Sequence, residues 1–156
     1  MIPFKYVLGF AREEDISEIL EAESLCFPDD PWGISSVTAM LKDENTGFVL
    51  WHPVEDTKKI AGYIVYSKSS FLELYKIAVV PKHRRKGLGS KMMEQLLRLG
   101  KGTEEKRIIL EVRESNTPAI ALYEKYGFKV DGVRKNYYKN PTENGILMSL
   151  DLNERQ

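Results

Sequence analysis

The stretch VVPKHRRKGLGSKMMEQL, Val79–Leu96, joins a predicted strand to a predicted helix. Its β-branched start ends at Pro81, which lacks the N–H that a strand ladder needs, and apolar residues then recur at helical spacing. Gly87 and Gly89 stand where that helix begins. The first N–H groups of a helix have no partner within it and lie at the positive end of its dipole. The junction therefore predicts an anion-binding loop.

The composition of this loop favours a phosphate. Glycines let an anion approach the backbone closely, and Arg84, Arg85 and Lys86 add positive charge. Two common phosphate loops do not match, because the Walker loop requires Gly-Lys-Ser/Thr and the dinucleotide fingerprint requires a third glycine where Met92 stands. The alternative is a solvated basic turn whose glycines only begin a helix. His83, within the same basic run, is expected to be solvated.

Outward from the junction, strand and helix patterns cover the chain and predict a mixed α/β (α+β) domain over residues 1–156. Strands are predicted at 5–12, 47–53, 59–68, 71–80, 107–113, 129–138 and 145–152, and helices at 12–27, 34–45, 87–99 and 115–128. The close spacing of the second, third and fourth strands favours antiparallel hairpins. A serine is expected to cap the second helix, and Gly127 to end the fourth.

Composition narrows the classes of function. Lys plus Arg equals Asp plus Glu at 23 each, so we expect no general attraction to nucleic acid or to an anionic membrane. Cys26 is the single cysteine, which excludes an intrachain disulfide and favours a cytoplasmic location. No signal peptide or membrane span is expected, because no window approaches about 20 apolar residues. Cys26, His52 and His83 are too far apart to predict a metal site.

Two motifs resemble the GNAT N-acetyltransferases. RRKGLG, Arg84–Gly89, is similar to the Arg/Gln-x-x-Gly-x-Gly/Ala loop that binds the pyrophosphate of acetyl-coenzyme A in that family. LEVRESNTPAIALYEKYGF, Leu110–Phe128, resembles the signature of the N-terminal protein acetyltransferases, which include the bacterial RimI-like and the archaeal enzymes. CFPDDPW and RKNYY resemble the acceptor-side segments of the same family, so the resemblance runs from about Phe4 to Leu150.

The resemblance implies a mostly antiparallel mixed sheet of about seven strands, flanked by four helices. It also implies a V-shaped split between the strand ending at Val80 and the strand Arg107–Arg113, with acetyl-coenzyme A in the split. The pantetheine arm would lie along Ile77–Val79, and the pyrophosphate on the N–H groups of Arg85–Ser90. The implied cofactor-binding residues are Ile77, Ala78, Val79, Arg84, Arg85, Lys86, Gly87, Leu88, Gly89, Ser90, Asn116 and Tyr123.

Two residues match the catalytic positions of the family. Glu111 faces away from Leu110 and Val112 by the alternation of its strand, and it matches the glutamate base that deprotonates the acceptor amine. An α-amine has a pKa of about 8, so this base handles a mildly acidic ammonium. Tyr123 matches the general acid near the cofactor sulfur. A backbone N–H near Val79 would polarise the thioester carbonyl.

Without the family resemblance, the residues allow a different interpretation of each catalytic assignment. Glu111 could instead pair with a strand cation such as Arg107, Arg113 or Lys129. Tyr123 could be a core tyrosine on the apolar face of its helix. Glu73, on the adjoining strand, could assist or replace Glu111, and the sequence leaves open which of the two is the main base.

The acceptor is implied to be a protein or peptide N-terminus, a ribosomal protein among the possibilities. Its predicted binding residues are Phe27, Trp32, Glu73, Tyr137 and Tyr138, with Pro31 beside them. A GNAT enzyme for lysine side chains or small amines is the alternative. A nucleic-acid-binding module is a third class, disfavoured by the neutral net charge and by Glu111 and Tyr123. We expect a monomer or a weak homodimer; the acceptor sequence and any auxiliary subunit stay open.

Overall fold

Seven strands form one mixed sheet in the part of the chain that the computed structural model describes, residues 5–154. The strands are β1 (Tyr6–Phe10), β2 (Thr46–Pro53), β3 (Gly62–Lys68), β4 (Leu72–Val79), β5 (Arg107–Arg113), β6 (Lys129–Tyr138) and β7 (Glu143–Asp151). The α-helices in those residues are α1 (Ile16–Cys26), α2 (Ile34–Lys42), α3 (Leu88–Lys101) and α4 (Thr117–Lys125). Short 3-10 turns span Glu13–Asp15, Pro81–His83 and Leu152–Glu154. Phe4, where the resemblance begins, and the remaining ends of the expected domain lie outside the described residues.

The strand order is β1-β2-β3-β4-β5-β7-β6. Antiparallel pairs join β1 to β2, β2 to β3, β5 to β7 and β6 to β7, whereas β4 and β5 run parallel. A parallel pair needs a long crossover, and the segment that contains α3 supplies it. The prediction of a mixed, mostly antiparallel sheet with four helices is confirmed. The β4–β5 register runs from Leu72 opposite Ile108 to Leu74 opposite Leu110; the V-shaped split stays a prediction.

The chain divides into two compact units. The first unit holds the residues up to Ser67 together with Lys76–Met92, and the second holds Lys68–Tyr75 together with the chain from Met93 onward. The expectation of a single domain over residues 1–156 therefore stays a prediction. Both β4 and α3 contribute residues to both units.

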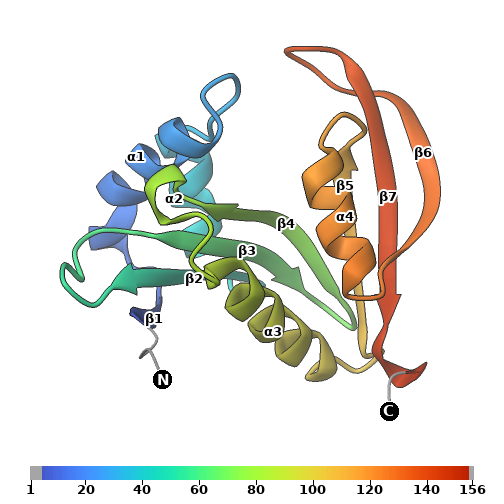
Figure 1. Cartoon of the computed structure of the whole chain (residues 1–156), viewed down its shortest axis with the longest axis horizontal. Coiled ribbons are helices and arrows are strands. Elements are labelled where there is room, and N and C mark those ends of the chain that lie inside the picture. The colour runs from blue at the N-terminus through green and yellow to red at the C-terminus, as the bar shows by residue number, and fades with distance from the viewer. Residues whose placement is uncertain (1–4, 155–156) are drawn as a thin grey trace. The chain divides into compact units, whose positions relative to one another are not determined.

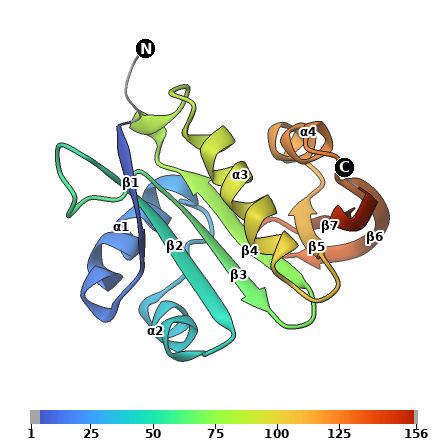
Figure 2. The same cartoon turned by 90° about the horizontal axis from the view of Figure 1, so that it is seen from below.

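In the first unit, α1 and α2 pack on β2 and β3 (Figure 2). Ile19 of α1 and Val37 of α2 are fully buried with Phe48, Leu50 and Tyr63 in one apolar cluster. The predicted serine cap of α2 is wrong. The N-cap is Gly33, whose extended backbone leads into the helix and whose carbonyl accepts a hydrogen bond from Val37 N, so the serines of the segment lie inside the helix.

In the second unit, β6 and β7 form a long antiparallel ribbon, orange to red in Figure 1, that pairs with β5 through β7. Ile108 and Leu110 of β5 and Met148 of β7 are buried, and the Tyr123 ring of α4 lies 5.6 Å from the Phe128 ring. Gly127 follows α4 with φ of +99°, a left-handed conformation that ends helices and that glycine adopts without strain. The predicted end of this helix is confirmed.

Candidate active site

The β4–α3 junction forms an open backbone loop in the first unit. Arg85 and Gly87 have φ of 61° and 82°, so the loop turns through the left-handed region twice. A Cβ added at Gly87 or Gly89 would meet no atom within 4 Å. Lys91 N donates to Gly87 O at 3.4 Å as α3 begins, so the N–H groups before it lie ahead of the intrahelical ladder. An anion can therefore approach these N–H groups directly.

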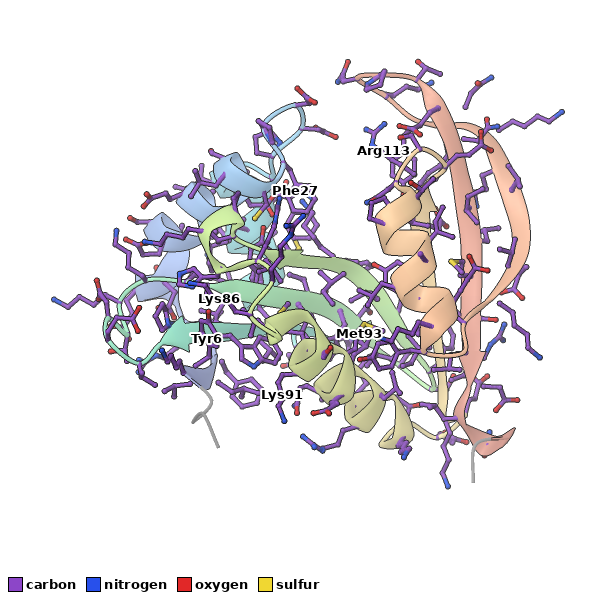
Figure 3. All side chains as sticks on the ribbon, in the orientation of Figure 1. Tyr6, Phe27, Lys86, Lys91, Met93 and Arg113 are labelled. Atoms are coloured by element: carbon purple, nitrogen blue, oxygen red, sulfur yellow. The ribbon has the colours of Figure 1, made fainter. Side chains whose placement is uncertain are left out.

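The basic side chains of this loop differ in what they do. Arg84, Arg85 and Lys86 are all exposed, and Figure 3 labels Lys86 just ahead of α3. Arg84 Nε, however, donates to Val79 O at 2.9 Å, which ties the loop to the end of β4. We infer that Arg84 shapes the loop, while Arg85 and Lys86 supply charge at its surface.

His83 is buried, so the expectation that it is solvated is wrong. Its side chain is 5% exposed, and Nδ1 lies 3.0 Å from the hydroxyl of Tyr6 on β1. Burial lowers the pKa of His83, and the charges of Lys86 and Lys82 lower it further. The residue is a neutral packing partner within an otherwise exposed basic run.

The strand segment expected beside the pantetheine arm lies next to this loop. Ala78 is buried toward Gly62, where an added Cβ would come within 2.9 Å of Ala78 O. Ile77 and Val79 alternate with Ala78 and are half-buried. The backbones of β3 and β4 are therefore closely packed on the Gly62 side of this segment.

A fully buried glutamate, Glu23 of α1, connects the acceptor-side residues of the first unit, and the sequence analysis missed it. Glu23 accepts hydrogen bonds from Trp32 N at 2.7 Å, from Lys76 Nζ at 2.8 Å and from the Tyr63 hydroxyl. The Lys76 ammonium lies 4.0 Å from the centre of the Phe27 ring and 3.8 Å from that of Trp32. We call Glu23, Phe27, Trp32, Tyr63 and Lys76 the Glu23 cluster. It fixes both predicted acceptor-side aromatics, Phe27 and Trp32.

Burial dominates the protonation of this cluster. It lowers the pKa of Lys76, against the hydrogen bond and charge of Glu23, which raise it. Burial and then the hydrogen bond to Glu23 raise the pKa of Tyr63. A signal existed in the sequence. Glu23 stands four residues after buried Ile19, on the same face of its helix, and Lys76 lies between buried Leu74 and Ala78 on the same face of its strand. Two charges on two buried faces indicate an ion pair.

The second unit contains the two carboxylates that the sequence offered as bases. Glu111 lies on β5, and Glu73 lies on β4 opposite Ile109, two residues from Glu111. Glu111 Oε1 is 3.5 Å from Arg134 Nε, whereas its Oε2 is buried and has no hydrogen-bond partner among the described residues. The cation beside Glu111 is Arg134, and not Arg107, Arg113 or Lys129, the strand cations considered from the sequence. Arg134 lies on β6 opposite Gly145, and its side chain extends over β7 to Glu111.

The groups around Glu111 are electrostatically coupled. Burial and then the charge of Glu111 raise the pKa of Glu73, and Arg134 opposes them. The hydrogen bond to Glu111, followed by burial, raises the pKa of Tyr137. Burial and then Glu111 raise the pKa of Tyr138 to about 12. We call Glu73, Glu111, Arg134, Tyr137 and Tyr138 the Glu111 cluster. Its excess negative charge and its unpartnered oxygen suit an ammonium ligand.

Arg113 holds the β6–β7 turn that directly follows the tyrosine pair, Tyr137 and Tyr138. It donates to Lys139 O at 2.7 Å, to Pro141 O at 2.9 Å and to Glu143 Oε2 at 3.1 Å. Figure 3 shows Arg113 at the end of β5, near this turn. Its guanidinium lies 4.6 Å from the Tyr138 ring centre, and the Tyr137 and Tyr138 rings are 5.0 Å apart. The predicted acceptor-side tyrosines are therefore held by a fixed cation.

The α4 residues combine a cap and a buried phenol. Asn116 is exposed and caps the helix, because its Oδ1 accepts from Ala119 N at 3.3 Å. Tyr123 is 5% exposed, and burial, then the charge of Tyr138, raises its pKa. A buried phenol of high pKa is protonated at neutral pH, which suits a proton donor and equally suits a core tyrosine.

The predicted site residues separate between the units as follows. The first unit brings together the loop Arg84–Ser90, the strand segment Ile77–Val79 and the pair Phe27 and Trp32. The second unit brings together Glu73, Glu111, Tyr137 and Tyr138, with Asn116 and Tyr123 on α4. Among residues 5–154, no three His, Cys, Asp or Glu side chains are grouped to hold a metal ion. No helix in that same part of the chain is both long and apolar enough to span a bilayer.

Comparison with known proteins agrees with this geometry. The acetyltransferase (GNAT) family matches residues 16–128. A Bacillus subtilis (strain 168) protein with the provisional name ribosomal protein bS18-alanine N-acetyltransferase is 33% identical over 144 residues, 92% of this chain and 93% of that protein. An N-alpha-acetyltransferase of Saccharolobus solfataricus is 29% identical and covers 94% of this chain and 93% of its own length.

A solved structure gives the same result for the fold. The crystal structure of the ribosomal-protein-S18-alanine N-acetyltransferase from Escherichia coli matches with a TM-score of 0.81 and 28% identity, over 93% of this chain and 92% of that one. The chain therefore belongs to the GNAT acetyltransferase family, and its fold is the GNAT fold.

Proposed function

We propose that the protein transfers the acetyl group of acetyl-coenzyme A to the α-amine of a protein or peptide N-terminus, with a ribosomal protein as one acceptor. The observation that carries the acceptor side is the Glu111 cluster, where a buried carboxylate oxygen has no hydrogen-bond partner within the described part of the chain and lies beside a second carboxylate. The relatives support an N-terminal acceptor over a lysine side chain or a small amine, because their names specify N-acetylation of an alanine of a ribosomal protein, or N-alpha acetylation.

The β4–α3 junction fits the donor. Open space at Gly87 and Gly89 leaves room for a pyrophosphate on the N–H groups of Arg85–Ser90, and Ile77–Val79 would line the pantetheine arm. Asn116 is a cofactor residue predicted in the second unit; its Oδ1 caps α4, which leaves its Nδ2 group as the donor. When bound, acetyl-coenzyme A supplies an acyl group activated as a thioester.

The second unit supplies the proton chemistry. Glu111 accepts the proton that the acceptor ammonium loses, and Glu73 is the alternative base beside it. Tyr123 holds a proton on its hydroxyl for the departing thiolate, as its raised pKa permits. Tyr137 and Tyr138 are the predicted acceptor-side residues of this unit, and Phe27 and Trp32 are those of the first unit. A cytoplasmic location and a monomer or weak homodimer stay predictions.

The acceptor assignment is tested with two peptide series. One has free N-termini that differ in the first two residues, and the other has acetylated N-termini and one internal lysine. We expect acetylation of the first series only. Equal acetylation of the blocked lysine peptides would contradict the N-terminal assignment and favour the lysine alternative.

The base is tested with Glu111→Gln. General bases contribute about 10²- to 10⁴-fold, so kcat should fall by that order below the amine pKa and recover in part at high pH. Glu114→Gln is the matched control, because Glu114 is exposed just beyond the same strand and contacts Asn144 Nδ2 at 3.4 Å. A normal pH profile in Glu111→Gln would transfer the base role to Glu73.

The cofactor loop is tested by calorimetry with Gly89→Val. The new side chain would occupy the space assigned to the pyrophosphate, so binding of coenzyme A should be lost while the melting temperature changes little. Gly33→Val is the control, because Gly33 also begins a helix of the first unit and has nothing within 4 Å of an added Cβ. Unchanged coenzyme A affinity in Gly89→Val would refute the loop assignment.

A further inference from the structure

We propose that Arg134 is an exchangeable counter-ion of the Glu111 cluster: its guanidinium neutralises Glu111 when no acceptor is bound, and the α-ammonium of the acceptor takes its place. The inference rests on the proposed function, since it concerns the same acceptor amine. It adds a residue that determines how strongly, and at which pH, that amine binds.

The contact between Arg134 and Glu111 is loose. The two atoms are 3.5 Å apart, beyond the usual 2.7–2.9 Å (roughly) of a charge-assisted hydrogen bond. The Arg134 side chain is 55% exposed, whereas that of Glu111 is 18% exposed. The Arg134 guanidinium also lies 5.3 Å from the ring centre of Tyr137, which gives it a second favourable contact. Because its cation is mostly in solvent and its contact is long, this ion pair is separated at little cost when another cation replaces Arg134.

Arg113 of β5, two residues from Glu111, is a fixed guanidinium in the same unit. It is 24% exposed in its side chain and makes the three contacts to the β6–β7 turn described above. Arg113 and Arg134 both lie opposite Gly145 of β7, so the two cations face similar surroundings. Arg113 is committed to the turn, and Arg134 is the cation of the pair that can leave.

The exchange also completes the hydrogen bonding of Glu111. Arg134 approaches only Oε1, and Oε2 remains buried without a partner among residues 5–154. An unpartnered buried carboxylate oxygen is costly, and an ammonium group has three donors in a compact volume. The α-ammonium of a peptide can satisfy Oε2 where the planar guanidinium does not.

The charges that face Glu111 come from several elements. They are Glu73 on β4, Arg113 on β5, Arg134, Tyr137 and Tyr138 on β6, and Glu143 on β7, with Tyr123 of α4 acting on Tyr138. Arg113 and Glu143 are paired with each other at 3.1 Å. Arg134 therefore provides the positive charge that faces the two carboxylates, and removing it should raise the pKa of Glu73 further.

The test uses Arg134→Gln and Arg134→Lys in the full chain, with Lys135→Gln as the control because Lys135 is the next exposed cation on the same strand. The first measurement is the titration of the Glu73 carboxyl carbon by NMR without ligands. The charge of Arg134 opposes the burial and the Glu111 charge that raise the pKa of Glu73, so in Arg134→Gln this carboxyl should titrate at higher pH than in the wild type, and in Arg134→Lys and Lys135→Gln it should titrate as in the wild type. Unchanged titration in Arg134→Gln would overturn the counter-ion role.

The second measurement is the acceptor KM and kcat across pH. In Arg134→Gln the acid limb of kcat/KM should move to higher pH, because the carboxylates lose the positive charge that faces them. Below the amine pKa of about 8, where the acceptor carries the charge that replaces Arg134, the acceptor KM should fall by up to about five-fold, with the change in KM rather than in kcat. A rise in KM would show that Arg134 holds the acceptor, which overturns the exchange.

Failure of the proposed function is distinguishable from failure of this inference. If the wild type acetylates no peptide amine while Arg134→Gln shifts the carboxyl titration, the proposed acceptor is wrong, and the exchange with its ammonium is wrong as well. If peptides are acetylated and neither the titration nor KM changes, the proposed function stands and the inference about Arg134 is wrong.

Discussion

The Glu23 cluster, built on a helix, and the Glu111 cluster, built on a strand, each contain a carboxylate and surround it in opposite ways. Glu23 is completely buried and accepts from three donors, one of them the Lys76 ammonium. Glu111 is half-buried, has one loosely held cation and a hydrogen bond with the Tyr137 hydroxyl, and its Oε2 has no hydrogen-bond partner among residues 5–154. A fully satisfied buried charge fixes structure, whereas a partly satisfied one remains available to a ligand.

The difference lies in what each partner can do. Lys76 is enclosed by the Phe27 and Trp32 rings, so it cannot leave Glu23 without exposing that carboxylate. Arg134 is mostly in solvent and can leave Glu111 freely. We infer that the first carboxylate contributes stability and the second contributes reactivity. Three substitutions test that contrast.

The largest effect is expected from Glu23→Ala. It leaves the Lys76 ammonium buried without its counter-ion, and breaking a buried pair costs about 3–5 kcal/mol of unfolding free energy. Urea denaturation measures the loss. The control is Glu18→Ala, a partly exposed α1 glutamate 3.5 Å from Lys59, which should cost at most about 1 kcal/mol. Equal losses in the two variants would remove the distinction between the clusters.

A smaller effect is expected from Tyr63→Phe. The ring and its packing on Phe48 remain, but Glu23 loses one of its donors, at a cost of about 1–3 kcal/mol. Tyr75→Phe is the control, because Tyr75 is 45% exposed and its hydroxyl is not part of either cluster. A stability equal to that of the wild type would show that Lys76 and Trp32 satisfy Glu23 without the phenol.

The smallest effect, and one of opposite sign, is expected from Glu73→Gln. The raised pKa of Glu73 means that the folded protein binds this proton more tightly than the unfolded chain. Stability is therefore lost as pH rises from the ordinary value of 4.5 through the raised one. The variant should melt at a slightly higher temperature than the wild type at pH 7 and show no gain near pH 4.

The control for this gain is Glu124→Gln on the exposed face of α4. A lower melting temperature of Glu73→Gln at neutral pH would show that the Glu111 cluster stabilises the fold as the Glu23 cluster does. A gain in stability together with slower acetylation would instead mark Glu73 as a residue kept for activity.

The sequence predicted local features well, because short-range geometry determines them. Pro81, the glycines and the apolar spacing of Val79–Leu96 specify a strand, a loop and a helix wherever they occur, and the structure places them there. Strand β5 was predicted at its observed bounds, Arg107–Arg113, because its alternation is regular. The serine cap of α2 failed because Gly33 could enter the helix without any side-chain cap.

Of the candidate site, the sequence by itself determined which residue types stand at which local position: Glu111 facing away from Leu110 and Val112, and the tyrosine pair at the end of β6. The tertiary structure alone decided their partners. Lys76 reaches Glu23 across 53 positions of the chain, and Arg134 reaches Glu111 only because β7 lies between β5 and β6 in the sheet. Charges have no periodicity that names a distant partner, so the order of the strands determines which carboxylate is satisfied and which remains available.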